Sequence, residues 1–87
     1  MPKRNAKPIA PHEQSSLETL ATNVRVLRQL RNITQEQLAE LAAMERTQVS
    51  AMERGVRAVQ FVTLDRLAKA LNVAPWELLR PRDSTGR

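Results

Sequence analysis

The sequence predicts a small all-α domain of five helices, and three observations support this prediction. Aliphatic residues recur every three or four positions in successive stretches, which is the spacing of one face of an α-helix. Residues that favour helix starts and helix ends stand at the borders of these stretches. The 87 residues include one Phe, one Trp and no Tyr, so the core that the helices enclose must be aliphatic.

The first helix is expected to start at Ser15. Ser15 and Glu18 have the spacing of a capping box, in which side chains satisfy two otherwise unpaired backbone N–H groups. Arg28 lies among apolar neighbours of this helix, and Glu53 is its candidate partner in an ion pair that fixes orientation more than it adds stability. An inward stripe runs along the helix at Leu17, Leu20, Val24, Leu27 and then Leu30 or Arg31.

Two short helices joined by a turn of about four residues are predicted between Thr34 and Gly55. Thr34 is a favourable N-cap, and Gln37 completes a second capping box. Gly55 suits the left-handed residue that ends a helix. The inward stripe of the first of these two helices is expected to comprise Leu38, Ala39, Leu41 and Ala42.

The second of these helices is predicted to turn a polar face outward. Val49 and Met52 are its inward apolar members, and about 100° of rotation per residue leaves a polar set on the opposite side and flanks. This set comprises Thr47, Gln48, Ser50, Ala51 and Arg54. Such a helix can enter the major groove of DNA, although an ordinary solvated helix presents a similar face.

Two further helices are expected before the chain ends. The fourth runs from about Phe61 to Leu71, with apolar residues on one side and charged residues on the other. The fifth is expected from Pro75 to Leu79, because proline is favoured at the first helical position. This short helix carries a large apolar surface that must be buried, and we expect it to form a homodimer interface through Trp76, Leu78 and Leu79.

The two ends of the chain are expected to be flexible, around a domain that spans residues 15–80. Residues 1–14 hold three prolines, three basic residues and no hydrophobic period. They form either a disordered leader or a basic arm that follows phosphates or enters a minor groove. Residues 81–87 include Pro81 and Gly86 and are expected to form a C-terminal tail.

Composition points to an anionic partner. The net charge is +5 and the isoelectric point is near 11.1, which favours nucleic acid as the partner, although this signal alone is weak. The chain has no cysteine, which fits a cytoplasmic protein. No stretch approaches the roughly 20 apolar residues that cross a bilayer, so we expect no membrane partner.

The sequence does not predict an enzyme. A nucleophile needs an adjacent base, and a lone histidine without cysteine or tyrosine supplies none. Two glycines cannot form a phosphate-binding loop. No His, Asp or Glu set has the spacing of a metal site. We therefore expect no cofactor, no metal and no small-molecule ligand.

Residues 20–79 resemble the helix-turn-helix domains of the lambda and 434 repressor and Cro type, the XRE family. The matching segments are VRVLRQLRNITQEQLAELA, TQVSAMERG and TLDRLAKALNVAPWELL, in that order. The segment ERTxVSxMERGxR also resembles the small controller proteins of restriction-modification systems. The resemblance implies a five-helix lambda-repressor-like fold that binds operator DNA, usually as a homodimer on inverted half-sites.

The resemblance also implies roles for individual residues. It places five residues of the third helix near base edges: Arg46, Thr47, Gln48, Ser50 and Ala51. It places three residues on phosphates: Gln35, Arg54 and Arg57. Arg46 is the main candidate for a base contact, because a guanidinium can hold guanine O6 and N7 together; the alternative is a phosphate clamp. Gln48 is a candidate for pairing with adenine. Arg28 and Glu53 match the internal ion pair of the family.

Three positions depart from the family pattern. Ala43 stands where the turn usually has glycine, so either a positive backbone angle costs strain there or the turn differs. Glu45 replaces the usual Ser or Thr cap and brings a negative charge towards incoming phosphates. Val59 and Gln60 stand where proline and a small polar cap usually open the fourth helix.

The function that these features predict is sequence-specific binding of double-stranded DNA by a homodimeric transcriptional regulator. Two other functions stay open. One is an antitoxin that uses the same domain to regulate its own operon and also binds a toxin protein. The other is a protein-interaction module that has the fold without the DNA function.

Overall fold

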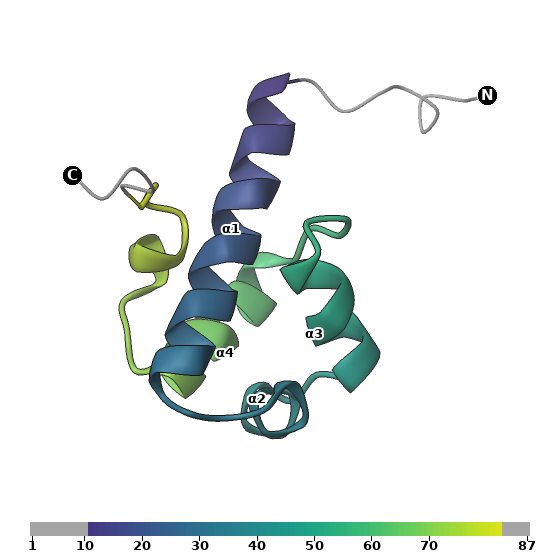
Figure 1. The fold of residues 1–87 in the computed structure, drawn as a ribbon, viewed down its shortest axis with the longest axis vertical. Helices are drawn as coiled ribbons and strands as arrows, with labels where there is room; N and C mark the ends of the chain where they lie inside the picture. Colours follow the sequence, from purple (N-terminus) through teal and green to yellow (C-terminus); the bar gives the residue numbers. More distant parts are fainter. Residues whose placement is uncertain (1–10, 83–87) are drawn as a thin grey trace.

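The computed structural model describes residues 11–82, with side chains from residue 16 onward. The elements in chain order are α1 (Pro11–Leu30), α2 (Gln35–Ala42), α3 (Arg46–Glu53), α4 (Phe61–Leu71) and the 3-10 helix η2 (Pro75–Leu78). Figure 1 shows α3 on one side of the long helix α1 and the C-terminal segment on the other. The all-α prediction is confirmed for these residues. The count of five α-helices is wrong, because residues 11–82 form four α-helices and one 3-10 turn.

Helix α1 begins at Pro11, four residues before the predicted start. Proline is favoured in the first helical turn, where its missing N–H would have no partner anyway. Ser15 therefore lies inside the helix and cannot be its N-cap, so the predicted capping box with Glu18 is wrong. Residues 11–14 belong to α1 and not to a flexible arm. Residues 1–10 and 83–87, which hold the rest of the predicted arm and most of the predicted tail, lie outside the described part.

The core is aliphatic, as predicted, and lies between α1, α2, α3, α4 and η2. Its fully buried members include Val24, Leu38, Val49, Met52, Leu67, Leu71 and Leu78. Burying each of the leucines stabilises the fold by about 1.5–3 kcal/mol. The prediction that Leu41 faces inward is wrong, because this side chain is largely exposed on α2.

The predicted fifth α-helix is instead one turn of 3-10 helix. The N–H groups of Glu77 and Leu79 donate to the carbonyls of Ala74 and Trp76, three residues back, at 2.9 and 3.1 Å. The carbonyls at the end of this turn accept hydrogen bonds from Asn23 on α1. Because α1 satisfies these acceptors, no further helical turn is needed to pair them.

The helix-turn-helix has the caps that the sequence predicts at its start and end. Thr34 Oγ1 accepts from the N–H of Gln37 at 3.0 Å, and Gln37 Oε1 accepts from the N–H of Thr34 at 2.8 Å. Gly55 has the predicted left-handed backbone, with φ of +75°. Ala43 also has a positive φ, +56°, in the turn before α3. A residue with a Cβ pays about 1–2 kcal/mol for that conformation.

Candidate nucleic-acid interface

Helix α3 is anchored by two buried side chains and presents polar ones. Val49 and Met52 are fully buried in the core, which fixes the rotation of the helix about its axis. Arg46, Thr47 and Gln48 are exposed at its N-terminal end. The predicted outward residues Ser50 and Ala51 are half-buried and form the shallower part of the same face.

The C-terminal end of α3 is held by the predicted ion pair. Arg28 Nε donates to Glu53 Oε2 at 2.7 Å, and Arg28 Nη2 donates to Glu53 Oε1 at 3.1 Å. Arg28 Nη1 also donates to the carbonyl of Ile33, in the turn that leads to α2, at 2.8 Å. The Glu53 side chain is only 4% exposed and that of Arg28 is 13% exposed. One guanidinium therefore fixes α3 and the entry to α2 together.

Two more side chains join this cluster. Gln35 Nε2 donates to Glu53 Oε1 at 3.1 Å, and Arg25 Nη1 donates to the carbonyl of Glu53 at 2.9 Å. The amide of Gln35 keeps a second N–H, which stands at the first turn of α2. The Glu53 carboxylate therefore orients Gln35, the residue that the family resemblance predicts to contact a phosphate.

The start of α3 uses Gln48 as part of its cap. Gln48 Oε1 accepts from the backbone N–H of Glu45 at 2.9 Å, so Glu45 serves as N-cap although it is neither Ser nor Thr. One of the two lone pairs of the Gln48 amide oxygen is thus used within the protein, and its Nε2 remains a donor. This bears on the predicted pairing with adenine, which requires the amide oxygen and nitrogen together.

Arg54 and Arg57 extend the exposed face beyond the end of α3. Arg54 Nη1 donates to Ser50 Oγ at 2.9 Å, one turn back, and both arginines are exposed. Gln48 and Arg57 line one hollow of about 310 Å³ between α3 and the loop that leads to α4. The structure thus joins Gln48 to Arg57 along one hollow and Ser50 to Arg54 by one hydrogen bond.

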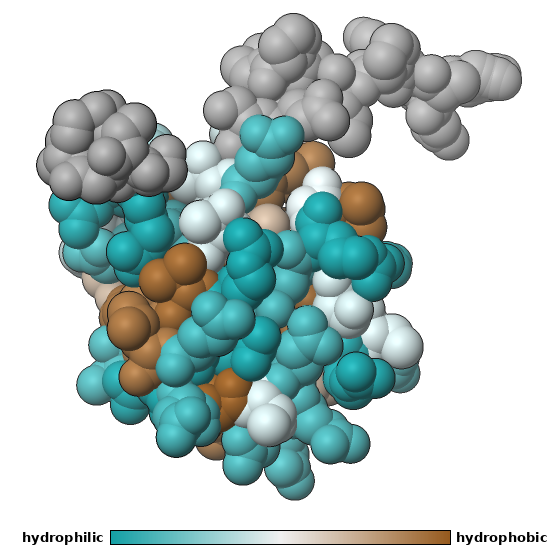
Figure 2. Space-filling model, in the orientation of Figure 1, coloured by the Kyte–Doolittle hydropathy of each residue, from teal (hydrophilic) through white to brown (hydrophobic). Residues whose placement is uncertain are grey.

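A second, apolar surface is formed by α4 and the C-terminal segment. Phe61 and Trp76 are 87% and 70% exposed, and they line an apolar hollow of about 400 Å³ with Leu79. Leu78 is fully buried in the core and has no surface to offer, so its predicted place in a dimer interface is wrong. In the view of Figure 2, apolar side chains gather towards the C-terminal segment and hydrophilic ones predominate around α2 and α3.

Metal sites and membrane-spanning helices concern residues 11–82, the part of the chain that the structure describes. That part of the chain holds no group of three or more His, Asp or Glu side chains arranged to bind a metal ion. None of its helices is long and apolar enough to span a membrane.

Comparison with known proteins identifies the family. Residues 24–78 match the helix-turn-helix family HTH_3, a segment that runs from the middle of α1 to the end of η2. The chain belongs to the HTH_3 family. This confirms the resemblance to XRE-type regulators that the sequence motifs indicated.

Relatives of this HTH_3 chain include controller proteins. The chain is 48% identical over 62 residues to the control protein C.SmaI of Serratia marcescens, covering 71% of this chain and 74% of that protein. The restriction-modification controller protein C.AhdI of Aeromonas hydrophila superposes with a TM-score of 0.71 at 38% identity, over 74% of this chain and 97% of that one.

A third similar structure contains DNA. It is the restriction-modification controller protein C.Esp1396I, solved as a tetramer in complex with its natural 35-base-pair operator. Its TM-score is 0.63 at 26% identity, and the match covers 74% of this HTH_3 chain and 95% of that one. The resemblance to restriction-modification controller proteins is therefore confirmed.

Proposed function

We propose that this chain is a transcriptional regulator that binds double-stranded DNA in a sequence-specific manner, as a homodimer on inverted operator half-sites. The observation that carries the proposal is the exposed polar face of α3. Two buried side chains, Val49 and Met52, and the ion pair of Glu53 with Arg28 hold this face in one orientation. The operator complex of C.Esp1396I supports the same use of the fold.

Base recognition is assigned to the N-terminal end of α3. Arg46 is exposed there, and its guanidinium can donate to guanine O6 and N7, which is worth about 1–3 kcal/mol of discrimination. Thr47 lies beside it and can bond to a base edge or contact a thymine methyl. Ser50 and Ala51 are half-buried one turn later, so they act at shorter range, through a hydroxyl and a methyl group.

Gln48 is assigned a donor role. Its amide oxygen accepts from the N–H of Glu45, which leaves Nε2 to donate. This group suits base atoms that only accept, such as guanine O6 and N7 or thymine O4, and does not suit the amino group of cytosine. Pairing with both adenine edge atoms would use the second lone pair of the oxygen that already accepts from Glu45, so the cap and the base would share one acceptor.

Phosphate contacts are assigned to Gln35, Arg54 and Arg57. The first turn of α2 has unpaired backbone N–H groups and the positive end of a helix dipole, and Gln35 adds its second amide N–H there. Arg54 and Arg57 are exposed at the far end of α3. The two ends of the helix-turn-helix can therefore hold the DNA backbone on both sides of a groove.

The homodimer is assigned to the apolar surface of Phe61, Trp76 and Leu79. Two exposed aromatic rings beside one apolar hollow are costly to leave in water, and a second copy of the same surface covers them by two-fold symmetry. In Figure 1 the C-terminal segment lies across α1 from α3. A dimer formed through this segment therefore leaves both α3 helices free.

DNA selection from a random pool tests the proposal. The purified full chain is expected to enrich an inverted repeat whose half-sites lie about 10 base pairs apart, one turn of the double helix. Its affinity for the enriched site is expected to fall steeply as salt rises, because several phosphates are neutralised. A pool without enrichment and a binding curve insensitive to salt would favour the protein-interaction module instead.

Arg46→Ala is the decisive variant. It is expected to lose most of the preference for the enriched site over random DNA while the far-UV helical signal stays unchanged. Arg80→Ala is the matched control: it removes the same charge from an exposed side chain on the C-terminal segment. Unchanged selectivity in Arg46→Ala would contradict the assignment.

A further inference from the structure

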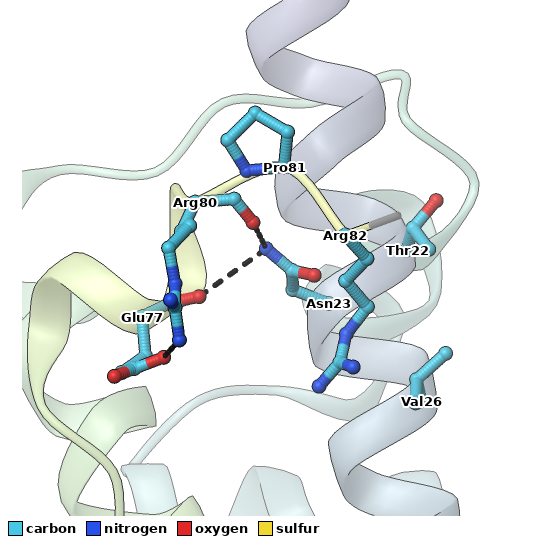
Figure 3. A pocket seen from close by; sticks show the side chains of 7 residues that line it. All are labelled: Thr22, Asn23, Val26, Glu77, Arg80, Pro81 and Arg82. Carbon is cyan, nitrogen blue, oxygen red and sulfur yellow. Dashed lines mark hydrogen bonds and ion pairs between the residues drawn. The ribbon is translucent and has the colours of Figure 1, made fainter. Parts of the chain in front are cut away.

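Asn23 connects α1 to the C-terminal segment across more than 50 residues of sequence. Its Nδ2 donates to the carbonyl of Leu78 at 2.8 Å, to that of Arg80 at 2.9 Å and, more weakly, to that of Glu77 at 3.3 Å. The residue is 1% exposed. Figure 3 shows the amide nitrogen directed at this segment from the wall of α1.

This contact is specific to an amide side chain. Two N–H groups on one nitrogen reach several carbonyls, and neither an aliphatic nor a carboxylate side chain of the same size could donate to them. The amide oxygen, by contrast, is buried with no hydrogen-bond partner. A buried polar atom without a partner costs about 1–3 kcal/mol, so the residue holds the segment in spite of that cost.

The segment that Asn23 holds is the one that presents Trp76 and Leu79. Leu78, between them in the sequence, anchors the segment in the core at one point. A single anchor leaves the segment able to rotate, and the carbonyl contacts before and after it remove that freedom. The position of the exposed apolar side chains therefore depends on Asn23 as well as on Leu78.

We propose that Asn23 is the positioning residue of the dimer interface: its amide holds the C-terminal segment in the conformation that a second copy of the chain recognises. This inference rests on the proposed homodimer. It assigns to α1 a role in self-association, although Asn23 itself is buried and touches no partner.

Loss of the amide is expected to act locally. The wall around Asn23 borders a hollow of about 680 Å³ lined also by Thr22, Val26, Arg80 and Arg82. Water from this hollow can reach the freed carbonyls, so the monomer need not unfold. If the segment is then ordered about a tenth of the time, the dimer Kd rises about a hundredfold, because both protomers must present it.

Trp76 supplies the measurement, because it is the only tryptophan and lies on the proposed interface. Its emission is recorded for the full chain over a dilution series, and sedimentation velocity gives the mass at each concentration. We expect a shift to shorter wavelength as the wild type dimerises. In Asn23→Ala the midpoint is expected to move to concentrations at least about tenfold higher.

Two further measurements separate local release from general unfolding. Far-UV circular dichroism is expected to stay close to that of the wild type. Amide hydrogen exchange is expected to rise in peptides covering residues 74–80 and to change little in α2 and α3. Thr22→Ala, in the same wall of the hollow, is the matched control and is expected to dimerise like the wild type.

The outcomes are distinct. A wild-type chain that stays monomeric overturns the dimer proposal itself, whereas a dimer that Asn23→Ala leaves intact overturns only the role of Asn23. Exchange that rises equally in every helix would also overturn it, since Asn23 would then be a general stability residue. If Asn23→Ala does not fold, Asn23→Leu keeps the size of the side chain without its N–H donors, and a dimer of wild-type strength in that variant counts against the proposal.

Discussion

Helix α1 fixes a distant segment on each of its two sides, and the chemistry of the two attachments differs. On one side Arg28 and Glu53 join as buried charges that hold α3. On the other side the neutral amide of Asn23 holds the C-terminal segment through backbone carbonyls. A charged attachment cannot lose one partner without stranding the other, whereas a neutral one can be released more cheaply. The helix proposed to meet DNA is thus attached more rigidly than the segment proposed to meet a second subunit.

The largest expected effect breaks the charged attachment. Glu53→Gln leaves the Arg28 guanidinium buried without a counter-charge and is expected to destabilise the chain by about 3 kcal/mol or more. Thermal or urea unfolding measures the loss. The double variant Arg28→Met with Glu53→Met removes both charges and is expected to recover much of that stability. A double variant no more stable than Glu53→Gln would show that the charges themselves are not what holds α3.

The next effect concerns the neutral side. Trp76→Ala removes a large exposed ring from the proposed dimer interface and is expected to weaken self-association by about 2 kcal/mol or more, the size of an interface hot spot. The unfolding of the monomer is expected to change little, because the ring is mostly exposed. Sedimentation over a concentration range measures the first quantity. Leu41→Ala, an exposed apolar residue on α2, is the control and should not affect the dimer.

A smaller effect tests how α3 reads bases. Gln48→Glu puts an acceptor in place of the donating amide, so bases that present only acceptors are expected to lose about 1–3 kcal/mol at the position it meets. Preference there should move towards cytosine, which presents an amino donor. Selection with the variant and with the wild type compares the two motifs. The same base at that position in both would contradict the donor role of Gln48.

The smallest effect concerns the turns that lead to the two held segments. Asn72 ends α4 with φ of +61°, and Ala43 ends α2 with φ of +56°. Asn adopts this conformation at a lower cost than Ala, so Ala43→Gly is expected to stabilise the chain by about 0.5–1 kcal/mol after allowing for the flexibility of unfolded glycine. Asn72→Gly is the control, in which little change is expected. Chemical denaturation resolves such a difference.

Features encoded by neighbouring residues could be predicted from the sequence. The box of Thr34 and Gln37, the left-handed Gly55 and the bounds of α4 all depend on residues a few positions apart. The pair of Arg28 and Glu53 is a long-range contact, yet it could be predicted because two opposite charges stand at inward positions of their helices. The start of α1 was predicted wrongly, because the capping pattern of Ser15 favoured a later start than Pro11, at which the helix begins.

Features that depend on packing could not be predicted in this way. Trp76, Leu78 and Leu79 are equally apolar in sequence, and only the position of the turn decides that Leu78 is buried and the others are not. Asn23 gave no signal, because its partners are carbonyl groups that every residue carries. The engagement of Gln48 with its own cap likewise depends on a side-chain rotamer. The contact roles assigned to α3 remain predictions.

The placement of α3 and the C-terminal segment on opposite sides of α1 has a consequence for spacing. In a dimer joined through that segment, each α3 helix is held on its own α1. The dimer therefore fixes the distance between the two α3 helices and their relative orientation. Inserting one base pair between half-sites turns one relative to the other by about 34–36°. A dimer of fixed geometry cannot follow that rotation. We therefore expect weaker binding to operators of altered spacing, even when every contacted base is correct.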